Sequence, residues 1–378
     1  MSNIFKKIID NKRVFIPIIS ENKRESKYQS KYRADYKSFI GKKILFLSSM
    51  VALVFVLGGL IVTIGPLDIS VIDVYKILLS RLFPGYFALE GLPAQVVWNI
   101  RIPRIVAGIM AGFGMGISGC VMQAVLKNPL ASPFTLGISA GASFGVAVAA
   151  VLGIGVIGGP YLLVGNAFLF AMLCSFFIIA LARFKGATSE TMILAGIAIN
   201  YLFGSLSDLL RYFATDQQLR VMVDWGMGDL SAFSWANFLL LLTLFVICTP
   251  LLYTRANDLN IMAIGDENAK SLGIDTNRVR IFSMVVASLL IATIVCFTGT
   301  IAFIGLVAPH MARMMIGSDH KYLFPASGLL GAITLMSADA IGMNLLDSVM
   351  IPTGIMTSML GVPFFLYLIL KRKRREFW

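Results

Sequence analysis

The side chains that most often perform catalysis or bind metals are scarce and scattered in this sequence of 378 residues. The two histidines, His310 and His320, lie apart from any cysteine or carboxylate pair, and the four cysteines show no CxxC spacing. Neither pattern predicts a metal site. The sequence also lacks a GxxxxGK(S/T) phosphate-binding loop, so the chain is not expected to hydrolyse nucleotide itself. We therefore predict a protein that is not an enzyme and that holds no metal or cofactor of its own.

Two carboxylates, Asp208 and Asp339, lie inside strongly apolar segments and are the candidates for an ion path. Each lies 18 residues beyond a residue expected at the cytoplasmic surface, Glu190 and Lys321 respectively. This separation corresponds to about 27 Å along a helix. Both carboxylates are therefore expected near the outer edge of the membrane, whereas secondary transporters place their coupling groups near the midplane. Any transport by this chain then draws its energy from elsewhere, and an ion-coupled secondary transporter remains the alternative class.

The composition identifies the elements that must position these residues as membrane-spanning helices. Hydrophobic residues make up 57% of the chain and charged residues 14%, and the mean hydropathy is +0.82. An average soluble protein has about 25% charged residues, so the sequence predicts an all-α polytopic membrane protein. The apolar runs predict ten spans: Ile44–Ile64, Ile105–Leu126, two within Phe134–Ala182, Thr191–Leu210, Ser234–Tyr253, two within Ile281–Ala312, Leu323–Leu346 and Ile355–Leu370.

Glycine and proline divide the two longest apolar runs into pairs of helices. In the first run, the residues from Gly153 to Pro160 predict a tight turn between two spans. In the second, Gly299, Gly305 and Pro309 predict a re-entrant or kinked joint.

The net charge of +12 is concentrated at the two ends of the chain. Residues 1–43 carry twelve Lys/Arg and four Asp/Glu, and residues 371–378 carry five Lys/Arg and one Glu. We predict two basic cytoplasmic tails, 1–43 and 371–378, around a permease-like domain at 44–370. With both tails inside, 26 of the 32 Lys/Arg fall in cytoplasmic segments, as the positive-inside rule requires.

Glycine recurs every fourth residue in two of the predicted spans. A spacing of four places residues on one helix face, where small side chains allow neighbouring backbones to approach closely. We predict helix-packing faces at Gly108, Gly112 and Gly116, and at Gly137, Gly141 and Gly145.

The cytoplasmic loop 255–280 is the longest predicted internal loop and is polar. Asn257 to Asn260 resembles a helix start, and Gly265 to Asn268 resembles the cap of a second short helix that ends at Gly273. Two short helices would form a rigid docking surface, whereas a solvated connector remains the simpler alternative.

Several motifs together resemble the FecCD family of binding-protein-dependent ABC transporters, which import iron-siderophores, haem and cobalamin. The resemblance covers residues 45–375 and rests on these segments: Arg101 to Arg104, Gly119 to Gln123, Lys127 to Ala131 with Pro133, Leu136 to Ala142, Gly265 to Gly273, Gly299 to Arg313, Asp319 with His320, Pro352 to Thr357, and Gly361 to Phe365. It implies a type II ABC importer permease in the cytoplasmic membrane of a prokaryote.

The resemblance also implies partners. They are a second permease copy or paralogue, two cytoplasmic ATPases that use ATP and Mg²⁺, a substrate-binding protein outside, and membrane lipid, with no nucleic acid. Arg101 and Arg104 match the arginines that meet the binding protein, although interfacial anchoring is an alternative. The residues that match the translocation gate are Asn128, Leu130, Thr188 and Ser189, which are also ordinary turn formers. The residues that match the ATPase-coupling segment are Asp266, Glu267, Ala269, Leu272 and Gly273.

The cargo is expected to be a chelated metal compound. A ferric siderophore is the first expectation, with haem or cobalamin as alternatives, because the gating residues carry little information about the cargo.

Overall fold

The computed structural model describes residues 38–65, 67–83, 91–185, 188–346 and 349–371. The predicted C-terminal tail beyond Lys371 and most of the N-terminal tail therefore lie outside the described residues. The chain divides into two units, Met1–Ser49 and Met50–Trp378. The described residues contain helices and connecting segments but no β-strand.

The predicted set of apolar helices is confirmed in number and order. Among the described residues, seven helices are long and apolar enough to cross a membrane: Ser38–Ile61, Leu92–Val125, Gly159–Leu181, Ser189–Phe213, Trp235–Thr254, Thr276–Thr298 and His320–Asn344. Three shorter apolar helices, Ile138–Leu152, Ile304–Ile316 and Thr353–Tyr367, occupy the positions of the remaining predicted spans.

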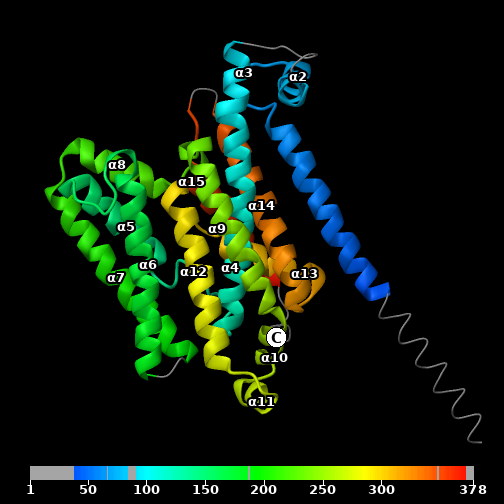
Figure 1. Cartoon of the computed structure of the whole chain (residues 1–378), viewed down its shortest axis with the longest axis vertical. Coiled ribbons are helices and arrows are strands. Elements are labelled where there is room, and N and C mark those ends of the chain that lie inside the picture. The colour runs from blue at the N-terminus through cyan, green and yellow to red at the C-terminus, as the bar shows by residue number, and fades with distance from the viewer. Residues whose placement is uncertain (1–37, 66, 84–90, 186–187, 347–348, 372–378) are drawn as a thin grey trace, which may run out of the picture. The chain divides into compact units, whose positions relative to one another are not determined.

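Further helices lie at the two ends of the second unit (Figure 1). At the end that we call the α2–α8 end are α2 (Val71–Leu82), α3 (Leu92–Val96) and α8 (Asp216–Met227). At the opposite end, called the α10–α11 end, lie α10 (Ala256–Met262) and α11 (Asp266–Ser271). The helices α2 and α8 had no counterpart among the predicted elements.

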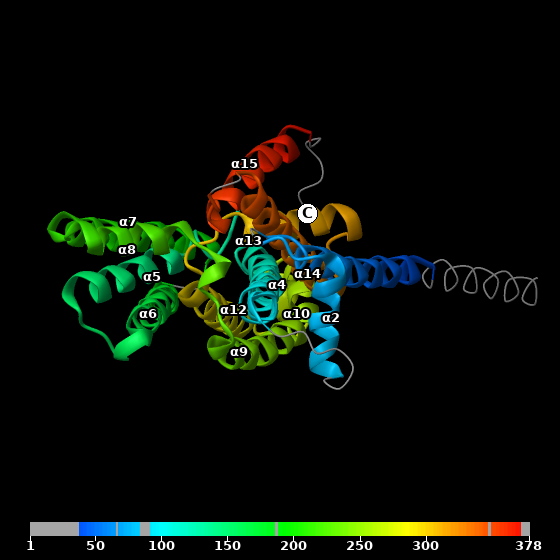
Figure 2. The same cartoon turned by 90° about the horizontal axis from the view of Figure 1, so that it is seen from above.

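The second unit is built around α4 (Ile102–Val125), which continues α3 through a π-helical turn at Val97–Arg101. Figure 2 shows α4 beside α12 (Thr276–Thr298), α13 (Ile304–Ile316) and α14 (His320–Asn344). On the far side of α12 lie α5 (Ile138–Ala147), α6 (Leu162–Lys185) and α7 (Ser189–Phe213). The remaining long helices are α9 (Trp235–Thr254) and α15 (Thr353–Lys371).

The glycine face of α4 packs against α14, as predicted. A Cβ on Gly112 would lie 2.5 Å from the carbonyl oxygen of Gly331, and a Cβ on Gly116 would overlap the carbonyl oxygen of Ser327. Gly108 instead faces the flexible side chain of Met336, at 3.1 Å. The two backbones therefore touch along the middle of α4, where any larger residue would push the helices apart.

The second predicted glycine face is correct at two of its three positions. Gly141 and Gly145 pack against the backbone of α6, near Phe170 and Asn166 respectively. Gly137 is not part of this face, because it lies before the first residue of α5 and has a left-handed φ of +76°. The helix therefore starts later than the regular spacing suggested.

The predicted joint within residues 281–312 lies at Gly299–Phe303, between α12 and α13. The prediction that Gly305 and Pro309 also break the helix is wrong, since both lie inside α13. Gly305 contacts α4 at Gly119, so its small size serves helix packing. Pro309 lies in the middle of α13 and does not end it.

Candidate functional site

The loop between α9 and α12 folds into the two short helices that the sequence predicted. Only Arg255 lies between α9 and α10, and residues 263–265 separate α10 from α11. α11 ends before Gly273, at the predicted position. The loop is therefore an ordered element rather than a solvated connector.

This element has a packed side and an open side. Leu259, Met262 and Ala269 are buried against the rest of the unit. On the open side Ile264 is 68% exposed and Leu272 is 65% exposed, and Glu267 is exposed beside them. Large apolar side chains that protrude from a polar loop are typical of protein-contact surfaces.

Asp266, the first residue of α11, connects that helix to the ends of two long helices. One carboxylate oxygen lies 2.9 Å from Nζ of Lys127, which follows α4. The other oxygen lies 2.9 Å from a guanidinium nitrogen of Arg280 on α12. Nε of Arg280 donates a hydrogen bond of 3.3 Å to the carbonyl oxygen of Val125, the last residue of α4. One carboxylate thus holds together α11, α12 and the end of α4.

The two cations also determine the charge state of this carboxyl group. Partial burial raises the pKa of Asp266, but hydrogen bonds and charge from Lys127 and Arg280 outweigh burial and lower the pKa below its ordinary value. Asp266 is therefore ionised at neutral pH.

Asn260 on α10 forms a second connection, to the start of α14. Its side-chain amide donates a hydrogen bond of 2.8 Å to Asp319, and its side-chain oxygen accepts one of 2.8 Å from the backbone N–H of His320. The ring nitrogen Nδ1 of His320 lies 2.7 Å from the same oxygen. The resemblance had singled out Asp319 and His320, but it gave no signal for their partner.

The residues predicted at the gate make local contacts at the same end of the unit. Asn128 accepts a hydrogen bond of 2.9 Å from the backbone N–H of Leu130, whose side chain is exposed. Thr188 caps α7 by accepting from the N–H of Thr191, and Ser189 is the first residue of that helix. These contacts are the turn and cap geometry expected of such residues, and their part in a gate stays a prediction.

At the α2–α8 end, Arg101 and Arg104 are both buried. Arg101 donates hydrogen bonds to the carbonyl oxygens of Val62 and Leu67. Arg104 makes two hydrogen bonds to Asp339 on α14, at 2.8 and 2.9 Å. Each guanidinium therefore has hydrogen-bond partners inside the chain, and a role for either arginine in docking another protein stays a prediction.

The ion pair of Arg104 and Asp339 belongs to a larger polar cluster. Asp229 lies 3.2 Å from the same guanidinium, and the hydroxyl of Thr353 at the start of α15 donates to Asp339. The cluster joins α4, α14, α15 and the segment after α8. The sequence placed Asp339 near one end of its helix, but it could not reveal a partner 235 residues away.

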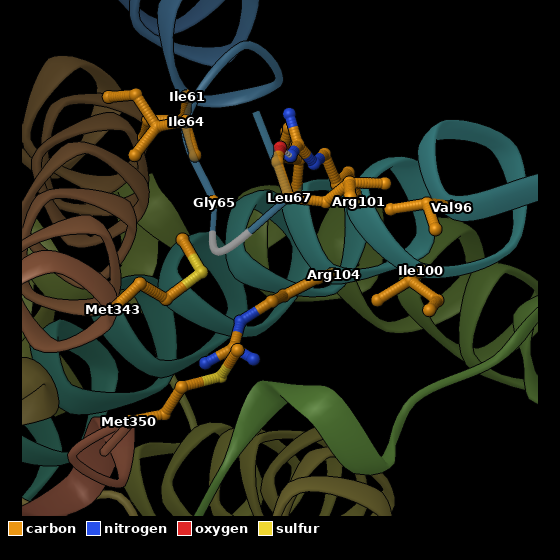
Figure 3. Close-up of a pocket in the computed structure, with 11 residues that line it drawn as sticks. Ile61, Ile64, Gly65, Leu67, Val96, Ile100, Arg101, Arg104, Met343 and Met350 are labelled. Carbon is orange, nitrogen blue, oxygen red and sulfur yellow. Dashed lines mark hydrogen bonds between the residues drawn. The ribbon is translucent and has the colours of Figure 1, made fainter. Parts of the chain in front are cut away.

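The same two arginines line a cavity of about 220 Å³. Figure 3 shows Arg104 extending towards Met350, with Arg101 beside Leu67. The remaining walls are mostly aliphatic, from Ile61, Ile64, Val96, Ile100, Ile105 and Met343. The cavity lining is therefore mainly apolar, with two arginines that are hydrogen-bonded within the chain.

The second candidate for an ion path, Asp208, lies in the last turns of α7. It forms an exposed ion pair of 2.9 Å with Arg211, one turn further along the helix. Within the described residues, no group of three or more His, Cys, Asp and Glu side chains is arranged to hold a metal ion.

Comparisons with known proteins agree with this architecture. The model of the FecCD transport family matches residues 50–371. A protein of Methanocaldococcus jannaschii named as an ABC transporter permease is 39% identical over 349 residues, covering 90% of this chain and 98% of the relative. A hemin transport system permease of Yersinia pestis is 37% identical, covering 74% of this chain and 85% of the relative.

A solved structure, an inward-facing metal-chelate type ABC transporter, has the same fold. The TM-score is 0.76 with 28% sequence identity, and the match covers 86% of this chain and 99% of that chain. The likeness therefore extends over nearly all of the apolar helices described above.

Proposed function

Because the chain belongs to the FecCD transport family, we propose that it is the permease subunit of an importer for a chelated metal compound. In this proposal, it crosses the cytoplasmic membrane of a prokaryote and binds no cofactor, while ATP and Mg²⁺ are used by a separate subunit. The partners are a second permease copy or paralogue, two cytoplasmic ATPases and an extracytoplasmic substrate-binding protein.

The observation that carries this proposal is the ordered α10–α11 element together with the family match. Ile264, Glu267 and Leu272 are exposed on this element, while Asp266 and Asn260 connect it to the long helices. An element that is exposed on one side and firmly attached on the other is suited to receive an ATPase and to pass on its movement. We propose an orientation in which the α10–α11 end of the unit and both predicted tails lie on the cytoplasmic side of the membrane.

A ferric siderophore is the cargo that we propose, because iron chelates are the commonest cargo that the family resemblance implies. Relatives of this chain are named as permeases for hemin, for Fe(3+)-citrate and for vitamin B12. Identification of the ligand on the partner binding protein tests this step. If haem or a corrinoid is found on the binding protein, that compound becomes the proposed cargo in place of the siderophore. The proposal that the chain is an ABC importer permease is then unchanged.

The coupling role of α11 is tested by Glu267→Arg, which reverses an exposed charge without touching the packed side. We expect the ATPase to co-purify and to hydrolyse ATP while uptake of the identified cargo falls, because the contact surface no longer matches its partner. Unimpaired uptake in this variant would remove the assignment of Glu267 to the coupling surface. Uptake that persists without ATP and stops when ion gradients collapse would indicate a secondary transporter instead.

A further inference from the structure

The segment expected to contact the ATPase and the segment expected at the translocation gate meet at the carboxylate of Asp266. The segment expected to receive the ATPase begins at Asp266, and the segment expected at the gate begins one residue after Lys127. These two side chains form an ion pair of 2.9 Å. The gate segment is thus one residue away from a direct contact with α11.

We propose that Asp266 is a positioning residue that transmits movement of α11 to the end of α4 and to the following segment, residues 126–133. This inference rests on the proposed function, since it requires an ATPase that moves α11. It adds a specific route, from α11 through one carboxylate to Lys127.

The surroundings of the carboxylate favour transmission rather than simple attachment. The side chain of Arg280 is only 4% exposed, and it holds the end of α4 through the carbonyl oxygen of Val125. Lys127 is more accessible and has a left-handed φ of +47°, which ends α4 and turns the chain towards Asn128. A shift of Asp266 therefore acts on the α4–α12 contact and on the turn at the same time.

Removing the charge of Asp266 does not detach the element from the unit. Asn260 still binds Asp319 and the backbone of His320, and Ala269 remains buried. The exposed residues Ile264 and Leu272 are also unchanged. The substitution Asp266→Asn keeps the shape of the side chain and loses the charge, so it separates docking of the ATPase from transmission.

The experiment measures hydrogen exchange in the full permease complex with its co-expressed ATPase, with and without ATP and vanadate. In the unmodified complex, we expect vanadate trapping to change exchange in both segments, 264–273 and 126–133. In Asp266→Asn, the change in 264–273 should persist, while the change in 126–133 should fall roughly fivefold, within the range known for coupling networks. Lys127→Gln, which leaves the Arg280 ion pair in place, should lower the change in 126–133 in the same direction, and the double variant should be no worse than Asp266→Asn alone.

Asp208→Asn is the matched control, because it removes an aspartate–arginine ion pair that is exposed at the end of α7. It should leave both responses unchanged. An undiminished response of 126–133 in Asp266→Asn, or additive losses in the double variant, would overturn the proposed transmission. The absence of bound ATPase, or of any response in either segment of the unmodified complex, would instead contradict the proposed function.

Discussion

The ion pair between Arg104 and Asp339 offers the sharpest quantitative test of the structure. The two side chains are 6% and 5% exposed, so solvent screens their interaction very little. The substitution Asp339→Ala removes both hydrogen bonds to Arg104 and the one from Thr353. It leaves a buried guanidinium with Asp229 as its remaining acidic partner, at 3.2 Å.

The expected cost follows from this change in partners. Breaking a buried ion pair by removing one member costs about 3–5 kcal/mol. Asp229 keeps part of the compensation, although it is 29% exposed and contacts only one nitrogen. We therefore expect a loss near the lower bound, about 3 kcal/mol, which is about two powers of ten in the ratio of folded to unfolded protein. Replacing both members, as Arg104→Met with Asp339→Leu, should recover most of this loss, because no charge is then left buried.

Steric trapping in bicelles measures the free energy of unfolding for each variant. Asp208→Ala is the control, because it breaks an aspartate–arginine pair whose members are 71% and 44% exposed. Such a pair contributes at most about 1 kcal/mol. A loss below about 1 kcal/mol for Asp339→Ala, or a double variant no more stable than the single one, would show that Arg104 does not depend on Asp339.

Two further predictions concern helix packing and the junction at α11. Gly116→Ala should destabilise the protein by about 1–3 kcal/mol, because the new methyl group overlaps the backbone of Ser327 on α14. Gly204→Ala is the control, because Gly204 lies in the open interior of α7, and it should stabilise the protein by up to about 1 kcal/mol. Thermal unfolding in detergent compares the two variants. Equal unfolding temperatures for both would refute the packing argument. The lowered pKa of Asp266 means that its ion pair stabilises the protein above about pH 4, the ordinary aspartate value, and that this contribution is lost as pH falls through the folded-state pKa. The vanadate response of residues 126–133 should therefore be constant from about pH 6 to 8, and a loss of response within this range would contradict the assignment.

Most of the fold was predictable because a membrane imposes simple rules on composition and length. Long apolar runs identify the spans, and the turns near Gly153 and Gly299 mark where one run contains two helices. The start of the second span was predicted too late, at Ile105, whereas the helix reaches back to Leu92. Arg101 and Arg104 lie in this earlier part of the helix, and their internal partners allow both to be buried.

The helices α2 and α8 and the polar contacts between distant residues were not predictable, for a different reason. α8 is amphipathic and polar, and it lies between two spans where a plain connection was the simplest expectation. The candidate site residues were named individually, by resemblance or by type, but the partners that the structure gives Asp266 and Arg104 lie far away in the sequence. Asp266 and Lys127, or Asn260 and Asp319, become neighbours only when the long helices pack.

The packing of α4 against α14 has a mechanical consequence for transport. The two antiparallel helices are joined at one end by Arg104 and Asp339, and their backbones touch at Gly112 and Gly116. At the other end, both are connected to the α10–α11 element. Because the carbonyl contacts leave no side-chain layer to absorb strain, the pair behaves as one rigid strut. If the protein is the importer permease proposed above, displacement of the α10–α11 end of this pair would rotate its other end, about 30 Å away, so that opening on one face would accompany closing on the other.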